Sequence, residues 1–247
     1  MRSSHGPITS LAGLGLFLAL WPILVVHAAY GVSVAEGFVP LCNPYWDGCT
    51  SISRAGRHGW ANHLFRGALL PYTVLLALYW WLNQRWLRAA GDRGSRWMVG
   101  TGLVGALFMI LYVTFLGTEG QTYQLLRRYG INVYFACTYM AQVILLGRLW
   151  ALEAVGTAPP RRPSRRLVVS LTTILSAVLA MGVVFVAVDY GLPLDRDRLQ
   201  NTMEWTAALL IQISILFVAL GWRADRLQLR VVADPEDNAM PRDGAKS

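Results

Sequence analysis

Leu167–Val188 reads LVVSLTTILSAVLAMGVVFVAV and contains no charged residue over its 22 positions. A helix that crosses a hydrocarbon core of ~30 Å needs about 20 predominantly apolar residues. Within lipid, a single segment satisfies its backbone hydrogen bonds by itself only as an α-helix. This stretch therefore predicts a transmembrane helix.

The rest of the chain repeats this pattern. Hydrophobic residues make up 55% of the 247 positions and charged residues only 15%, which is outside the ordinary range of soluble domains. Counted with the first stretch, the apolar windows predict an all-α, polytopic membrane protein with a bundle of six transmembrane helices. The six predicted spans lie near Leu11–Tyr30, Leu64–Trp81, Trp97–Leu116, Ile131–Trp150, Leu167–Val188 and Met203–Trp222.

The first window has a second interpretation. Arg2 precedes the apolar run and the small residues of His27-Ala28-Ala29 resemble a signal-peptidase site. The run is, however, longer than a typical signal-peptide core of about 7–15 residues, and Pro22 lies within it. We therefore expect the first helix to be retained as a span.

The distribution of basic residues predicts the orientation. With both termini in the cytoplasm, 15 of the 22 Lys and Arg residues fall on the inner side and the remaining 7 on the outer side. Cytoplasmic loops carry the excess of basic residues, so the termini are predicted to face inward. A single Lys against abundant Arg further suggests the cytoplasmic membrane of a bacterium. The net charge of +8 is explained by topology and does not require nucleic acid as a partner.

The spans and their connections predict one domain. Residues 1–226 form the six-helix transmembrane domain, with an outer loop over residues 31–62. Residues 227–247 are polar and contain Pro and Gly, so we expect a disordered cytoplasmic tail.

The outer loop contains Cys42 and Cys49, separated by Pro44 and the turn pair Asp47-Gly48. Two cysteines at this spacing on an oxidising face predict a disulfide-closed turn. A metal site is the rival interpretation, but no further Cys or His lies at a convincing ligand spacing. Cys137, within the fourth span, is expected to be a packing residue. No metal and no cofactor is predicted.

After the second cysteine, Ser51-Ile52-Ser53-x-x-Gly56 precedes a second span led by Phe65. Two further motifs are Gly130-x-x-x-x-Phe135 in the fourth span and Glu204-Trp205-Thr206-x-Ala208 in the sixth. Together they resemble the six-helix family of damage-regulated autophagy modulators (DRAM), the FGF-receptor-activating protein and GPI-lipid-remodelling proteins (the Frag/DRAM/Sfk type).

The resemblance covers the chain from the first loop to the last helix, although its motifs are short. It departs from the family at Thr50, where a proline is expected, and at Arg127, where relatives often have histidine. What the resemblance implies is a lipid-related role in the membrane.

Ionisable and polar residues at the edges of spans are costly in a bilayer and suggest function. Here they cluster at the predicted outer level and would form a polar cup for a lipid headgroup, in which Arg66 could bind a phosphate. The alternative is that Arg66 and Glu204 neutralise each other structurally. The predicted headgroup residues are Arg66, Glu204, Asn132, His63, Glu119 and Asp189.

The sequence leaves enzymatic activity open but does not favour it. Ser53, His58, His63 and Glu204 are candidate groups for acyl transfer or hydrolysis, yet no Gly-x-Ser-x-Gly elbow is present. The two histidines lie five apart, which does not match the i, i+4 spacing of helical zinc sites. We therefore expect a protein that binds, senses or organises lipid at the outer leaflet, or assists a partner membrane protein. The alternative is a membrane-embedded lipid-remodelling enzyme.

Overall fold

The computed structural model describes residues 8–155, 163–191 and 195–230, and within these ranges it confirms the six-helix bundle. Each helix is long and apolar enough to cross a membrane, and the chain is a multi-pass membrane protein. The six long helices are α1 (Ala12–Ala35), α3 (Gly59–Ala89), α4 (Arg96–Thr114), α5 (Gln121–Ala154), α6 (Arg165–Gly191) and α7 (Arg196–Ala224).

Short polar side chains mark the beginnings of several helices. Ser95 accepts a hydrogen bond from the backbone N–H of Met98 at the start of α4, and Asp195 accepts one from Arg198 at the start of α7. These caps satisfy N–H groups that have no partner within a helix. They explain why α4 and α7 begin directly after Ser95 and Asp195.

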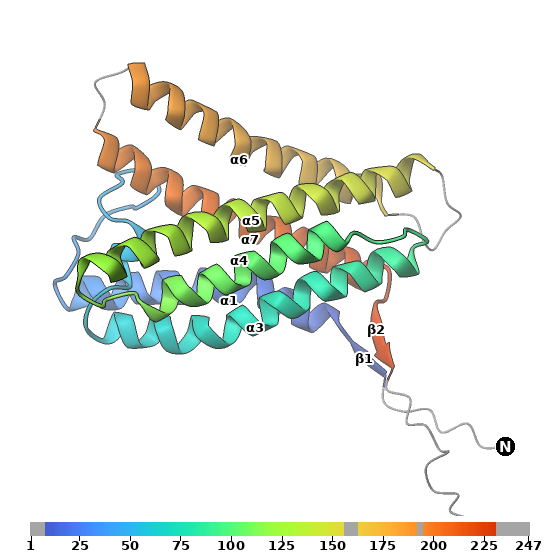
Figure 1. Cartoon of the computed structure of the whole chain (residues 1–247), viewed down its shortest axis with the longest axis horizontal. Coiled ribbons are helices and arrows are strands. Elements are labelled where there is room, and N and C mark those ends of the chain that lie inside the picture. The colour runs from blue at the N-terminus through green and yellow to red at the C-terminus, as the bar shows by residue number, and fades with distance from the viewer. Residues whose placement is uncertain (1–7, 156–162, 192–194, 231–247) are drawn as a thin grey trace, which may run out of the picture.

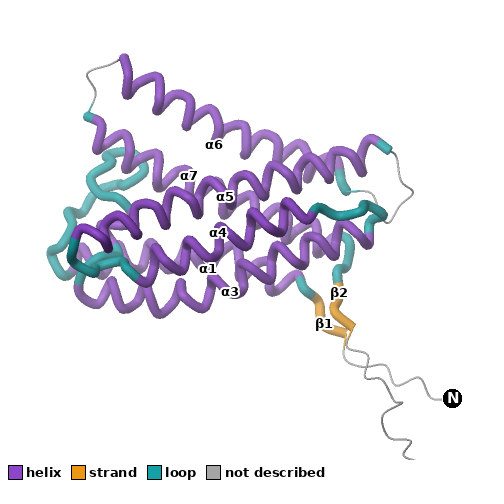
Figure 2. Tube along the Cα trace, viewed as in Figure 1, coloured by secondary structure: helices purple, strands orange, loops and turns teal. Residues whose placement is uncertain are grey.

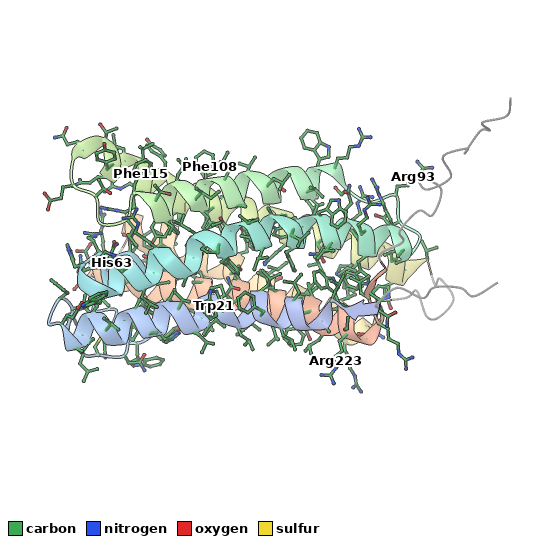
Figure 3. All side chains as sticks on the ribbon, turned by 90° about the horizontal axis from the view of Figure 1, so that it is seen from below. Trp21, His63, Arg93, Phe108, Phe115 and Arg223 are labelled. Atoms are coloured by element: carbon green, nitrogen blue, oxygen red, sulfur yellow. A yellow bond between two sulfur atoms is a disulfide. The ribbon has the colours of Figure 1, made fainter. Side chains whose placement is uncertain are left out.

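The helices run side by side along one axis, as Figure 1 shows. The connections from α1 to α3 and from α4 to α5 lie at one end, together with the short helix α2 (Ile52–Ala55). This end is called the disulfide end because the Cys42–Cys49 bridge that the sequence predicts is formed in the first of these connections. In Figure 3, His63 and Phe115 lie at the disulfide end and Arg93 and Arg223 at the opposite end.

The opposite end carries a feature that the sequence did not predict. Strand β1 (Ile8–Ser10) pairs antiparallel with strand β2 (Gln228–Arg230), as Figure 2 shows. This corrects the expectation of a disordered tail from residue 227, because backbone hydrogen bonds to the N-terminal segment order residues 228–230. Residues 231–247 lie outside the described part. We call this end the terminal end.

Small residues let the helices approach closely within the bundle. A Cβ atom on Gly102 of α4 would collide with the indole of Trp80 on α3, and one on Gly130 of α5 would lie 2.9 Å from the backbone nitrogen of Tyr112 on α4. Close backbone approach at glycine is a common way to pack helices in lipid. Gly130 belongs to one of the motifs that carry the family resemblance, and in the structure it allows α5 to pack closely against α4.

Candidate functional site

An apolar cavity of about 60 Å³ lies among α1, α3, α4, α5 and α7, towards the disulfide end. Its wall on α7 extends from Trp205 to Gln212, which is roughly 10 Å along the helix axis at 1.5 Å per residue. Other wall residues include Leu69, Met109 and Tyr134.

Two polar groups sit within this apolar wall without hydrogen-bond partners in the described part of the chain. They are the side-chain oxygen of Gln212, a residue that is only 6% exposed, and the hydroxyl of Tyr112. The Tyr112 hydroxyl faces Ser53 but does not meet the ordinary geometry of a hydrogen bond with it. Unpartnered buried polar atoms are costly, so each of these groups is available to a ligand or to water.

The disulfide loop covers the cavity at the disulfide end and is hydrogen bonded to two helices. Tyr30 of α1 donates its hydroxyl proton to the Cys42 carbonyl at 2.8 Å, and Asn201 of α7 donates to the Gly48 carbonyl at 2.8 Å. The indole N–H of Trp205 donates to the Thr50 carbonyl at 2.9 Å. The first loop is therefore a fixed cover for the cavity.

Tyr45 is the residue of this loop that reaches the cavity wall. Its hydroxyl lies 3.0 Å from Nε2 of His27, and its ring packs edge-on against Trp205. Burial raises the pKa of the Tyr45 phenol, so it remains a neutral hydrogen-bonding group.

A polar cluster adjoins the cavity at the same end. The carboxylate of Glu204 faces the backbone N–H groups of Ile52 and Ser53 in the α2 turn. The next residue along α7, Trp205, and Ile52 itself both line the cavity. Glu204 thus connects the α2 turn to α7 beside the cavity opening.

Arg57 is the central cation of this cluster. Its Nε atom is buried and has no hydrogen-bond partner in the described part of the chain. Burial, followed by the like charges of Arg127 and Arg54, lowers the pKa of Arg57, while Glu204 opposes that shift. Among the described residues, no carboxylate lies within 4 Å of any of these three arginines. Three arginines near one another, of which Arg57 interacts with Glu204, leave an excess of positive charge that suits an anion.

The ion pair of the alternative interpretation, in which Arg66 and Glu204 neutralise each other, is not formed in the described part of the chain. No ion pair joins these side chains, because the α2 turn rather than α3 supplies the partners of Glu204. Arg66 is half-buried on α3 and does not line the cavity.

The predicted polar cup is only partly assembled. His63, Glu119 and Asn132 are exposed and do not line the cavity, and the His63 ring packs beside that of Trp60. The Asp189 side chain lies outside the described part of the structure. Of the six predicted headgroup residues, Glu204 is the one that the structure places at the polar cluster.

The candidate groups for acyl transfer are not brought together. Ser53 lies beside Glu204, whereas His58 is exposed and packs against the ring of Phe38. No hydrogen bond joins Ser53 to His58 or His63 in the described residues. The described part also contains no group of three His, Cys, Asp or Glu side chains that could bind a metal ion.

Sequence reasoning did not select Arg57, Arg127 or Tyr112. Arg57 directly follows the Ser51–Gly56 stretch that carries the family resemblance, and this position was the available signal. Arg127 and Tyr112 belong to spans far along the chain, so only the packing of α4 and α5 brings them to the α2 turn.

The chain matches no protein-family model, no curated protein and no solved structure.

Proposed function

We propose that this protein binds a membrane lipid at its disulfide end, with an apolar chain in the cavity and an anionic headgroup at Arg57. The buried, unpartnered Nε of Arg57 next to an apolar cavity is the observation that carries the proposal. A guanidinium group donates paired hydrogen bonds to phosphate, which would satisfy that nitrogen.

The position of the site agrees with a lipid ligand. The cavity wall on α7 extends over roughly 10 Å along the helix axis, which is a large part of a leaflet that is about half of ~30 Å thick. The cationic cluster lies at the end of the helices, where headgroups lie. An amphiphile bound here would place its apolar chain against the apolar cavity wall and its anionic headgroup against the arginines.

The cellular setting belongs to the same proposal. The basic-residue bias puts the disulfide end outside and both termini in the cytoplasm, so the ligand would come from the outer leaflet. A bacterial cytoplasmic membrane and membership of the DRAM-like family remain parts of this proposal, supported by composition and by the short motifs quoted above. A role as an accessory to another membrane protein is compatible with lipid binding.

Native mass spectrometry of the gently purified protein, with identification of co-purifying lipids, tests the headgroup site. Arg57→Gln is expected to lose retained lipid by about tenfold or more, because a hydrogen bond to a charged group contributes roughly 1.5–3 kcal/mol. Arg128→Gln is the matched control, since Arg128 is an exposed arginine at the same end of α5. Equal lipid retention in wild type and Arg57→Gln, or no retained lipid in either, would contradict the proposal.

A second variant tests the chain site independently of charge. Ala208 lines the cavity, so Ala208→Trp should fill it and displace lipid whatever its headgroup. Ala136→Trp makes the same change at an exposed position on α5 and should leave lipid retention unaltered. Retention of lipid by a folded Ala208→Trp protein would show that the chain lies elsewhere.

A further inference from the structure

Helices α5 and α6 touch over only part of their length. The indole of Trp150 donates to the Thr172 hydroxyl at 3.0 Å, and the Tyr139 hydroxyl donates to the Leu175 carbonyl at 3.0 Å. From there towards the disulfide end, the two helices separate, as Figures 1 and 2 show. The Tyr139–Leu175 contact is therefore the closed end of a wedge between α5 and α6.

This wedge is an apolar groove of about 520 Å³. Among the described residues that line it, Tyr139 is the one with a polar side chain, and its hydroxyl is already bonded to the Leu175 carbonyl. Leu179 and Val183 remain 57% and 61% exposed on its α6 side, and Gly182 between them has no neighbour within 4 Å of a Cβ position. The groove therefore has room along α6 and offers no hydrogen bond.

The groove continues the face of α5 that lines the cavity. Phe135 lines the cavity and Tyr139 lines the groove, and residues four apart lie on one face of a helix. On α7, the cavity residues Ala208 and Leu209 are only half-buried. The two apolar spaces are thus neighbours on one side of the bundle, about one helical turn apart.

The shape of the groove favours a flexible chain over a helix. Two packed helices keep an interaxial distance of about 8–10 Å along their contact. A space that narrows to the Tyr139–Leu175 hydrogen bond would contact a straight partner helix only at its wide end. A hydrocarbon chain can follow the taper to its closed end.

We infer that the groove between α5 and α6 takes the second chain of a diacyl lipid whose first chain occupies the cavity. This inference rests on the proposed function and names its ligand class as diacyl rather than single-chain. Both chains then reach one headgroup at the disulfide end, where Arg57, Arg54 and Arg127 supply the positive charge. The α5 face between Phe135 and Tyr139 separates the two chains.

The test compares binding of dioleoyl phosphatidylglycerol and monooleoyl lysophosphatidylglycerol to the delipidated full-length protein in detergent, by native mass spectrometry titration. Gly182→Trp fills the groove at a position with open space, and Gly100→Trp makes the same change at an exposed position on α4 that also has open space. We expect Gly182→Trp to weaken binding of the diacyl lipid by about tenfold, which corresponds to 1.4 kcal/mol, and to leave the lysolipid unaffected. Gly100→Trp should alter neither.

The outcomes separate the inference from the function on which it rests. If wild type binds both lipids and Gly182→Trp leaves their affinity ratio unchanged, the groove does not hold a chain, while the cavity site stands. If wild type binds neither lipid, the proposed function itself fails. Retained lysolipid binding by Gly182→Trp also shows that this variant is folded, so a selective loss of the diacyl lipid cannot be attributed to unfolding.

Discussion

The Tyr45 hydroxyl lies 3.0 Å from Nε2 of His27, and this contact joins the disulfide loop to α1 at the cavity wall. The other ring nitrogen of His27, Nδ1, lies 2.7 Å from the carbonyl of Ile23, which can only accept a proton. This assigns the hydrogen of a neutral His27 to Nδ1 and leaves Nε2 to accept from Tyr45. The direction of the bond thus follows from its neighbours.

Tyr45→Phe should loosen the cover of the cavity without removing its aromatic packing. The variant loses the bond to His27 but keeps the ring that packs on Trp205. A hydrogen bond of this kind contributes about 1 kcal/mol, so we expect faster amide hydrogen exchange in the disulfide loop and a small decrease in melting temperature. Tyr129→Phe, at an exposed tyrosine of α5, is the control. Unchanged hydrogen exchange in the loop would show that the disulfide and the other hydrogen bonds are sufficient to hold the loop without the Tyr45–His27 bond.

Gly48→Ala should destabilise the protein more than Gly37→Ala. Both glycines have positive φ, +58° and +77°, so alanine is strained at either position by about 1–2 kcal/mol. At Gly48, the added Cβ would also collide with the carbonyl of Arg198 on α7, whereas at Gly37 it has open space. The difference between the two melting temperatures in detergent measures the contact of the loop with α7. Equal losses in the two variants would indicate that the loop does not pack on α7 in solution.

Asp225→Asn should stabilise the terminal end at neutral pH. The Asp225 carboxylate accepts a hydrogen bond from the indole of Trp86 at 2.7 Å, but burial outweighs this bond and raises the pKa of Asp225. A raised folded-state pKa means that the folded protein binds the proton more tightly, so stability falls as pH rises above the ordinary value of 3.8. Asparagine keeps an acceptor for Trp86 and removes the charge.

Melting temperatures of wild type and Asp225→Asn, measured from pH 4 to pH 8, test this predicted dependence of stability on pH. The variant should melt above wild type at pH 7, and the difference should shrink as the pH falls towards 4. Glu119→Gln removes an exposed carboxylate and should show no such trend. If wild type is more stable than Asp225→Asn across this range, the hydrogen bond between the ionised carboxylate and Trp86 stabilises the fold by more than burial of the charge destabilises it.

Much of the architecture could be predicted, because the bilayer imposes a length and an apolar composition on every span. Each of the six predicted windows coincides with a helix; four lie wholly inside one, the first begins one residue before α1, and the third ends two residues after α4. The Cys42–Cys49 pairing could also be predicted from the sequence, because the two cysteines are close together and turn residues lie between them. The pairing of β1 with β2 could not be predicted, because each strand is only three residues long and its partner is far away in sequence.

The residues of the site were harder to predict than the spans. Polar side chains at span edges are visible in the sequence, but which of them face inward depends on how each helix is rotated. Glu204 turns towards the α2 turn, while Asn132 and Glu119 face outward. The sequence alone therefore suggested Arg66 as the partner of Glu204, although the packed bundle places Arg57 nearby instead.

The sequence by itself determined that this is a six-span membrane protein with a disulfide-closed loop, because hydrophobic length and cysteine spacing are local properties of the chain. Only the tertiary structure decided that the loop covers an apolar cavity, that Arg57 near it has a buried Nε without a partner in the described part of the chain, and that α6 leaves a wedge next to α5. Those features depend on helix rotation and tilt. Both are set by close contacts between distant residues, such as Gly130 with Tyr112 and Tyr139 with Leu175.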